Sequence, residues 1–180
     1  MSSGRPHIRQ ARPADASAMA HTHVTTWRSD YRGFAPDDYL AALSEDEVRR
    51  GYEEIIGSFH SMAFVAEDDA GHVVGLSACG PYRDEGHVLS AAFSAELYNL
   101  YVVTDARKSG AGRELVRAAA RGLLSRGIAS MMLWTLEGYE SNTFYPRLGG
   151  KIVGRRKAMI GSNEVSDLAF GWEDISAILS

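Results

Sequence analysis

The stretch Arg107–Gly112, with the sequence RKSGAG, decides how this chain of 180 residues is organised. The apolar run Leu97–Val103 before it is typical of a strand, and Arg113–Arg126 after it has apolar residues at helical spacing. The first backbone N–H groups of a helix lack partners within the helix and lie at the positive end of its dipole. Glycines let an anion approach these groups closely, and Arg107 and Lys108 add positive charge. The stretch therefore predicts a site for a ligand that carries phosphate.

The spacing of the glycines narrows the choice of that ligand. A P-loop requires G-x-x-x-x-G-K-[ST], and no stretch of the chain supplies it. A dinucleotide fingerprint requires a third glycine three residues after Gly112, where Leu115 stands instead. The pattern that remains is [Arg/Gln]-x-x-Gly-x-[Gly/Ala]. A plain helix cap, in which the glycines serve only the turn, is disfavoured because glycines weaken the start of a helix.

The composition is that of one globular domain over residues 1–180. Hydrophobic residues make up 45% and charged residues 23%, and the net charge of −4 argues against general nucleic-acid binding. No apolar run approaches the length of a membrane-spanning helix, and Met1–Pro6 lacks the apolar core of a signal peptide. Cys79 is the single cysteine, so no internal disulfide can form. We therefore expect a cytoplasmic protein without membrane partners.

The predicted elements follow the order β-α-α-β-β-β-α-β-α-β-β. The strand–helix–strand portion around RKSGAG implies one parallel pair within a mostly antiparallel sheet flanked by helices, an α/β (α+β) fold. Asp15 is expected to cap the first helix, and Ser44 and Glu47 have the spacing of a capping box. The predicted strands are His7–Gln10, Ser61–Glu67, Val73–Cys79, Leu97–Val103, Ser130–Leu136, Lys151–Gly154 and Val165–Trp172. The predicted helices are Ala16–Trp27, then two short helices that count as one in this order, from Pro36 through Leu43 and from Ser44 to Gly57, then Arg113–Arg126 and a short helix with Asn142–Arg147 in its middle.

A second constellation, Thr143–Gly150 (TFYPRLGG), completes a pattern with RKSGAG. Together they resemble the GNAT superfamily of acyl-CoA-dependent N-acetyltransferases over nearly the whole chain. The family's second motif carries an asparagine and an alanine where this chain has Gly138 and Ser141, and its first often has a proline where Thr104 stands. The asparagine's contact with the cofactor is therefore not transferred to Asn142.

The resemblance implies the GNAT acyl-CoA N-acyltransferase fold, acetyl-CoA as co-substrate and no metal. Tyr145 is the expected general acid for the departing thiolate, although a buried core tyrosine is the alternative. Glu96 is the expected base, acting through water, although a solvent-facing glutamate at a strand end explains it about as well. Val102 is the expected backbone donor to the thioester carbonyl, within the strand residues 100–103. The expected cofactor-binding residues are Val102, Val103, Arg107, Lys108, Ser109, Gly110, Ala111, Gly112 and Arg113.

Acyl transfer to an amine also sets a physical requirement. A free alkyl ammonium has a pKa of about 10.4, so its neutral form costs roughly 4.6 kcal/mol at pH 7. A carboxylate acting through water must remove the proton, or the site must depress the pKa of the amine. Besides Glu96, the weaker candidates for this base are Asp84, Glu85 and Glu137.

The acceptor is less well defined by the sequence. In the family, the region of Trp27 and Tyr31 forms one wall of the acceptor pocket, and Tyr82 has a similar status after the third strand. Membership of the core explains all three equally well. An arginine in the pocket would suit an amino acid, whereas Asp84 and Glu85 would suit a polyamine or an aminoglycoside. The resemblance also permits a homodimer through the late strands, such as Val165–Trp172.

Two classes of function remain after these arguments. The first is an N-acetyltransferase that transfers the acetyl group of acetyl-CoA to a primary amine of a small molecule. The second is a non-catalytic acyl-CoA-binding sensor or regulatory module with the same fold, which the departure at Gly138 supports. A different phosphate binder, using the loop for a nucleotide, is a weaker third reading.

Overall fold

A computed structural model describes residues 6–83 and 88–180. Its strands form one seven-stranded sheet in the order β1-β2-β3-β4-β5-β7-β6. Only β4 and β5 are parallel, and every other neighbouring pair is antiparallel, which confirms the predicted mixed sheet. The strands are β1 (His7–Gln10), β2 (Met62–Glu67), β3 (Val73–Pro81), β4 (Ala95–Val102), β5 (Met131–Leu136), β6 (Lys151–Ile160) and β7 (Asn163–Trp172).

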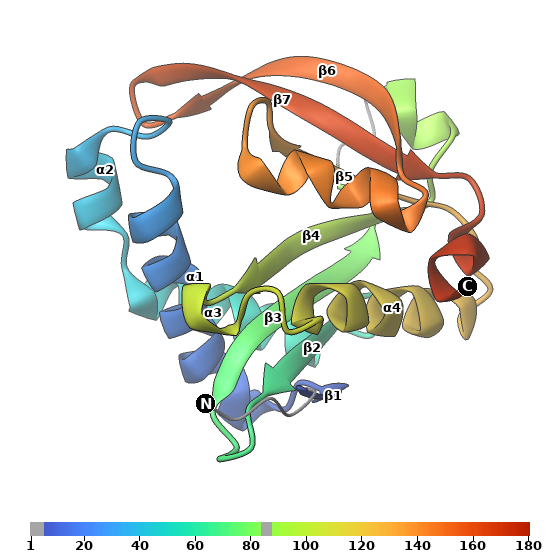
Figure 1. Cartoon of the computed structure of the whole chain (residues 1–180), viewed down its shortest axis with the longest axis horizontal. Helices are drawn as coiled ribbons and strands as arrows, with labels where there is room; N and C mark the ends of the chain where they lie inside the picture. Colours follow the sequence, from blue (N-terminus) through green and yellow to red (C-terminus); the bar gives the residue numbers. More distant parts are fainter. Residues whose placement is uncertain (1–5, 84–87) are drawn as a thin grey trace.

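Helices cover both faces of the sheet (Figure 1). Because side chains alternate along a strand, Val65 packs into the core beneath α1 and α3, while Ala66 packs beneath α4. The short helix α2 lies at one end of the molecule, beyond α1. The α-helices are α1 (Ala16–Asp30), α2 (Asp37–Ala42), α3 (Glu45–Gly57) and α4 (Ala111–Leu124), and the 3-10 helix η6 (Ile175–Leu179) packs against α4.

The predicted helix Asn142–Arg147 is wrong in its type. The chain forms two 3-10 turns there, η4 (Glu140–Thr143) and η5 (Tyr145–Leu148). Pro146 lies in the first turn of η5 and has no N–H to donate, and Gly149 follows at a φ of 82°. The segment is therefore too interrupted to build a continuous α-helix.

Of the two predicted helix caps, one forms its capping hydrogen bond and the other does not. The hydroxyl oxygen of Ser44 accepts a hydrogen bond from the backbone N–H of Glu47 at 3.3 Å, as the capping pattern predicts. Asp15 occupies the N-cap position of α1, as predicted, but its side chain makes no capping hydrogen bond to that helix. Its carboxylate accepts from the backbone N–H of Arg12 at 2.6 Å and from the guanidinium of Arg9 at 2.7 Å, because a cation on the adjacent strand is within reach.

The last two strands are longer than predicted and form one hairpin. The first of them was predicted to cover only 151–154, whereas β6 extends to Ile160 and pairs with β7 from Asn163 to Gly171. Polar residues such as Arg156 and Lys157 obscure this strand because much of β6 is exposed. In Figure 1 the hairpin arches over the molecule toward α2.

The two halves of the sheet meet over a short distance. In the parallel pair, only Ala95 with Met131 and Glu96 with Met132 are in register. Opposite this point a bulge between Ala78 and Cys79 inserts one extra residue, Tyr98, into β4. Beyond it β4 and β5 diverge, and this divergence positions the site.

Candidate active site

A cleft of about 790 Å³ opens where β4 and β5 diverge, a size suited to a small-molecule ligand. Its middle is formed by the residues 97–102 of β4 and 133–135 of β5. Residues 106–110, 112 and 113 form one end of the cleft. The α1 side contributes Thr26 and Asp30, together with Tyr31 just after the helix. The η4–η5 region contributes Phe144, Tyr145 and Arg147. The structure thus brings the two sequence motifs to one cleft.

The RKSGAG stretch begins α4, as predicted. Gly110 is the N-cap residue with a φ of 93°, a conformation that glycine adopts without strain, and Lys108 also has a positive φ of 64°. The Ser109 hydroxyl donates to the carbonyl of Ala106 at 2.7 Å and holds the turn. Of the predicted loop residues, Arg107–Gly110, Gly112 and Arg113 line the cleft, whereas the side chain of Ala111 is buried in the core. The free amides at the start of α4 therefore adjoin the cleft.

Arg107 was expected to offer its charge to the phosphate, but its side chain is already bound within the protein. Its guanidinium forms an ion pair with the buried carboxylate of Asp30, and its Nε donates to the carbonyl of Val102 at 3.2 Å. The same carboxylate accepts from the hydroxyls of Tyr139 and Ser29, each at 2.6 Å. Much of the positive charge of Arg107 is therefore already balanced within the protein.

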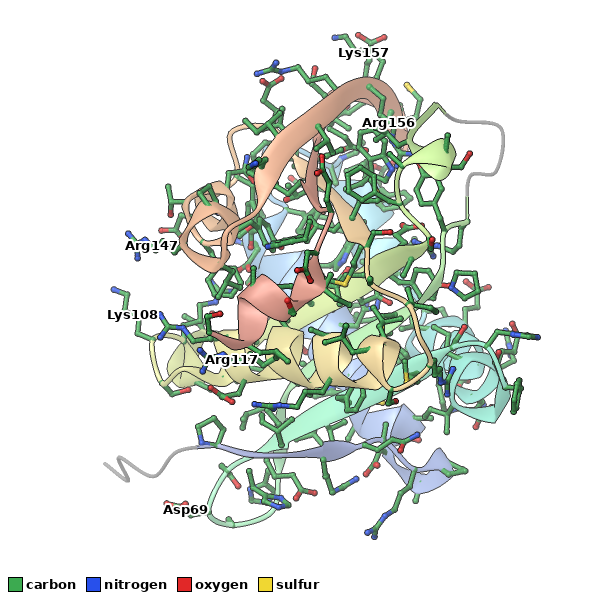
Figure 2. All side chains as sticks on the ribbon, turned by 90° about the vertical axis from the view of Figure 1, so that its right-hand side faces the viewer. Asp69, Lys108, Arg117, Arg147, Arg156 and Lys157 are labelled. Carbon is green, nitrogen blue, oxygen red and sulfur yellow. The ribbon has the colours of Figure 1, made fainter. Side chains whose placement is uncertain are left out.

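Other cations remain at this part of the cleft. Lys108, Arg113 and Arg147 line it, and the described residues 6–83 and 88–180 give none of them a carboxylate partner. Figure 2 shows Lys108 and Arg147 projecting at the same edge of the molecule. These three side chains can supply the charge that a diphosphate requires.

Tyr145 lies in the cleft with 6% of its surface exposed, among the rings of Phe144, Phe170 and Trp172. Burial raises the pKa of its hydroxyl to about 12, although the side chain of Ser141 opposes the shift. The hydroxyl is therefore protonated at neutral pH and can donate a hydrogen bond. Both readings of Tyr145, a core tyrosine and a cleft donor, fit this position.

The backbone N–H groups of Val102, the last residue of β4, and of Val103, which follows it, point in different directions. The N–H of Val103 donates to the carbonyl of Val74 at 2.9 Å, on the side of β3. Alternate N–H groups of a strand point to opposite sides, so the N–H of Val102 points toward the cleft. Val102 lines the cleft and Val103 does not. The prediction that Val103 binds the cofactor is therefore not supported, because its N–H is bonded to β3.

Glu96 does not line the cleft, contrary to the expectation for a base. Its carboxylate is 5% exposed and accepts three hydrogen bonds from Arg83, from the backbone N–H at 3.2 Å, Nε at 3.2 Å and Nη2 at 2.7 Å. The Glu96 carboxylate is therefore engaged by Arg83 outside the cleft, where it is not positioned to take a proton from a bound amine. Glu137 pairs with Arg155 away from the cleft, while Asp84 and Glu85 lie outside the described residues.

The predicted acceptor residues are divided by the structure. Tyr31 lines the cleft. Trp27 lies behind it, with ring centroids 4.2 Å apart, and its indole N–H donates to the hydroxyl of Tyr101 at 2.9 Å. Tyr82 is buried among Leu89, Phe93, Met132 and Ala169 and does not line the cleft, because an aromatic ring after β3 is drawn into that apolar cluster.

Sequence reasoning missed several residues of the cleft. Asp30 carried one signal, since a carboxylate at the C-terminal end of a helix opposes the helix dipole and requires compensation. Tyr101 was visible only as part of an apolar strand. The cleft residues that were not singled out from the sequence include Thr26, Asp30, Tyr98, Asn99, Tyr101, Trp134, Thr135, Tyr139, Glu140, Ser141, Thr143 and Arg147.

Residues 6–83 and 88–180 contain no cluster of three or more His, Cys, Asp or Glu side chains suited to a metal ion. In the same described part of the chain, no helix has the length and apolar character needed to cross a bilayer.

A strand–loop–helix anion site beside a buried tyrosine, in a cleft between diverging parallel strands, defines a GNAT acyltransferase. The model of the Acetyltransferase (GNAT) family matches residues 24–149, and the chain belongs to this family. It is an acetyltransferase by that membership.

Individual relatives agree with this assignment. The chain is 31% identical over 175 residues to the uncharacterized N-acetyltransferase YuaI of Bacillus subtilis (strain 168), covering 95% of each protein. Its fold is similar to an N-acetyltransferase from Staphylococcus aureus Mu50, with a TM-score of 0.73, 18% identity and coverage of 96% and 99% of the two chains. It is also similar to a phosphinothricin acetyltransferase from Sinorhizobium meliloti in complex with AcCoA, with a TM-score of 0.72, 18% identity and coverage of 94% and 88%.

Proposed function

We propose that this protein transfers the acetyl group of acetyl-CoA to a primary amine of a small molecule, by direct attack of the amine. The observation that carries the proposal is that the amides at the start of α4 and the hydroxyl of Tyr145 meet in one cleft. A phosphate site alone would suit many ligands, and a buried tyrosine alone would suit any core. Their combination suits a cofactor with a diphosphate at one end and a thioester at the other.

The cofactor would lie along the diverging strands. The amides at the start of α4 receive the pyrophosphate, apart from that of Ala111, which donates to the Ser109 hydroxyl at 3.3 Å, and Lys108, Arg113 and Arg147 balance the charge. The thioester carbonyl faces β4, where the N–H of Val102 donates to the oxygen as it gains negative charge in the transition state.

Deprotonation of the amine follows from the environment more than from a single base. Glu96 is bound by Arg83, and Asp30 is occupied by Arg107 and Tyr139. Burial raises the pKa values of Tyr31 and Tyr101, both of which line the cleft. The same loss of solvation lowers the pKa of a bound ammonium and favours the neutral amine that can attack.

Tyr145 would donate to the sulfur as the carbon–sulfur bond breaks. A thiol has a pKa of about 8.5, so complete proton transfer from a hydroxyl with a pKa of about 12 is uphill by roughly 5 kcal/mol. A hydrogen bond that strengthens as the thiolate forms is the cheaper contribution. As general acid, Tyr145 then passes its proton to the thiolate and takes back from solvent the proton that the new amide nitrogen releases.

The experiment is the release of free thiol from acetyl-CoA across a panel of amines, with the wild type and Tyr145→Phe. We expect Tyr145→Phe to lower kcat at least about tenfold, the lower limit for a lost donor in the transition state, while the Kd for CoA changes little. An unchanged kcat would refute the role of Tyr145. Tight CoA binding without thiol release for any amine, in either protein, would favour the sensor function instead.

A further inference from the structure

The side of the cleft beneath α1 is built from aromatic rings. We call the set Tyr31, Tyr98, Tyr101, Trp134 and Tyr139 the aromatic wall, since each of these residues lines the cleft. The rings of Tyr31 and Tyr139 lie 5.6 Å apart, and both Tyr31 and Tyr101 interact electrostatically with Tyr145. The aromatic wall therefore adjoins the hydroxyl that we place at the sulfur.

The charges of the cleft are distributed unevenly. Its cations, Arg107, Lys108, Arg113 and Arg147, belong to the phosphate loop, the start of α4 and η5. The aromatic wall consists of neutral side chains, because burial raises the pKa values of Tyr31, Tyr101 and Tyr139. Among the described residues that line the cleft, the aromatic wall therefore has no cation of its own.

Two arginines stack on this wall without lining the cleft. Arg83 lies over the ring of Tyr98 and Arg156 over the ring of Trp134, each 4.1 Å from the ring centroid. Arg83 is held by the buried Glu96 and Arg156 by the buried Asp167 at 3.1 Å. Their charges are therefore matched within the protein, and an anionic acceptor would have to compete with a buried carboxylate.

The β6–β7 hairpin lies behind part of the aromatic wall, because Tyr31 and Tyr139 pack against a cluster that includes Ile160 and Val165. The side chain of Asn163 donates to the carbonyl of Phe34 at 3.1 Å, which joins the hairpin tip to the segment between α1 and α2. Ala35 and Leu40 pack there with Ile160 and Val165 in one apolar cluster. In Figure 1 the hairpin tip reaches α2. The end of the cleft at Tyr31 and Tyr139 is therefore backed by packed side chains, which suits a small acceptor better than a polypeptide that lies across the cleft.

We infer that the acceptor is an arylalkylamine, a primary amine on a short alkyl chain with an aromatic ring and no carboxylate beside the amine. The inference rests on the proposed function. Aromatic rings pack well against an aromatic body and attract its ammonium before deprotonation. A carboxylate on the acceptor would lose its hydration beside the wall without gaining a cation. A polyamine would need several carboxylates, whereas the described residues that line the cleft offer Glu140 and the already paired Asp30.

The test compares 2-phenylethylamine with L-phenylalanine, which differ only in the carboxylate. At saturating acetyl-CoA we expect kcat/KM for 2-phenylethylamine to be at least about 100-fold higher, the scale of one unpaired buried charge. Equal or higher kcat/KM for L-phenylalanine or spermidine would overturn the inference and leave the acetyltransferase function intact. If no amine causes the release of free thiol from acetyl-CoA, the proposed function is refuted instead.

If there is no turnover, the inference can still be tested by measuring how tightly the protein binds each amine. Calorimetry of the CoA-bound protein should detect 2-phenylethylamine and detect L-phenylalanine at least tenfold more weakly. Equal affinities would overturn the inference whatever the turnover.

Variants locate the effect in the aromatic wall. We expect Tyr31→Leu to raise KM for 2-phenylethylamine about tenfold with little change in KM for acetyl-CoA. The matched control is Tyr39→Leu, a more exposed tyrosine near Trp27 that does not line the cleft. Equal effects of the two substitutions would contradict the role of the wall. Thermal unfolding of each variant, with Tyr31→Phe as a milder change that keeps the ring, separates a binding effect from misfolding.

Discussion

Asp30 connects three segments that are distant in the sequence. Its carboxylate ends α1 and binds the guanidinium of Arg107 in the phosphate loop and the hydroxyl of Tyr139 after β5. A carboxylate at the C-terminal end of a helix is unfavourable by itself, so the cation and the hydroxyls compensate for it. One residue thus fixes the cleft wall of α1 to both halves of the sheet.

Replacing Asp30 should reveal this connection in the stability of the protein. Burial acts to raise the pKa of Asp30, but hydrogen bonds from Ser29, Tyr139 and Arg107 outweigh it and lower the pKa. The stabilisation is therefore complete above about pH 4 and is lost as the pH falls through the lower pKa of the folded state. We expect Asp30→Asn to lower the free energy of unfolding by about 1–3 kcal/mol at pH 7, and by less at pH 3. Urea titrations at both pH values measure the difference, and an equal loss at both would contradict the assignment.

A substitution at Glu96 can distinguish a catalytic role of this residue from a structural one. A catalytic base contributes roughly 100-fold or more to the rate, whereas a buried partner of Arg83 contributes to stability. We expect Glu96→Gln to lower kcat less than about fivefold, to leave the shape of the pH–rate profile unchanged and to reduce the free energy of unfolding by about 1–3 kcal/mol. Loss of the acidic limb of the profile would restore Glu96 as the base.

The start of α4 is the element on which the proposed cofactor site depends. Gly110 has a φ of 93°, so any side chain there is strained. Gly112 lies within the first turn, and a Cβ there would only meet the ring of Phe144 at 3.6 Å, an ordinary contact. The two glycines therefore serve different purposes, one for the turn and one for access to the amides.

Alanine at each position should separate these purposes. We expect Gly110→Ala to lower stability by about 1 kcal/mol, the cost of the left-handed conformation. Gly112→Ala should retain or slightly raise stability, because alanine favours the helix, yet weaken CoA binding by tenfold or more. Thermal unfolding and CoA titration of both variants provide the measurement. Undiminished CoA affinity in Gly112→Ala would argue against approach of the phosphate to this turn.

The sequence predicted this element well and others less well, for physical reasons. RKSGAG and the first five strands depend on neighbours along the chain, and these strands begin and end within two residues of the predicted positions. The fates of Glu96, Asp15 and Tyr82 depended on partners brought by folding, namely Arg83, Arg9 and an apolar cluster. The 3-10 turns around Tyr145 depended on Pro146 and Gly149, which interrupt a pattern that otherwise favours a helix.

At the scale of the whole molecule, the late strands bear on assembly. Val165–Trp172, considered for a homodimer, lies in β7 between β5 and β6 and is largely buried. A homodimer through the late strands would therefore use β6, the edge strand, which exposes Ile152 and Met159. Such a homodimer, the cytoplasmic location and the extent of the domain over residues 1–180 stay predictions.

The core makes the single cysteine a reporter of global unfolding. Cys79 is fully buried, and burial raises the pKa of its thiol to about 12. We expect no reaction with a disulfide reagent in the native protein at pH 8 and one thiol per chain in denaturant. Thiol release from acetyl-CoA can then be followed without background from the enzyme. Rapid modification of the native protein would show that the core opens locally around Cys79.

The brief pairing of β4 with β5 has one more consequence, which concerns solubility. Beyond Glu96 and Met132, each strand presents main-chain donors and acceptors to the space between them, as the outer strands of a sheet do. Such rows invite an extended segment from another molecule to add itself as a strand. An occupied cleft would cover them. We therefore expect the cofactor-free form to aggregate more readily than the CoA-bound form, so storage with CoA should slow precipitation.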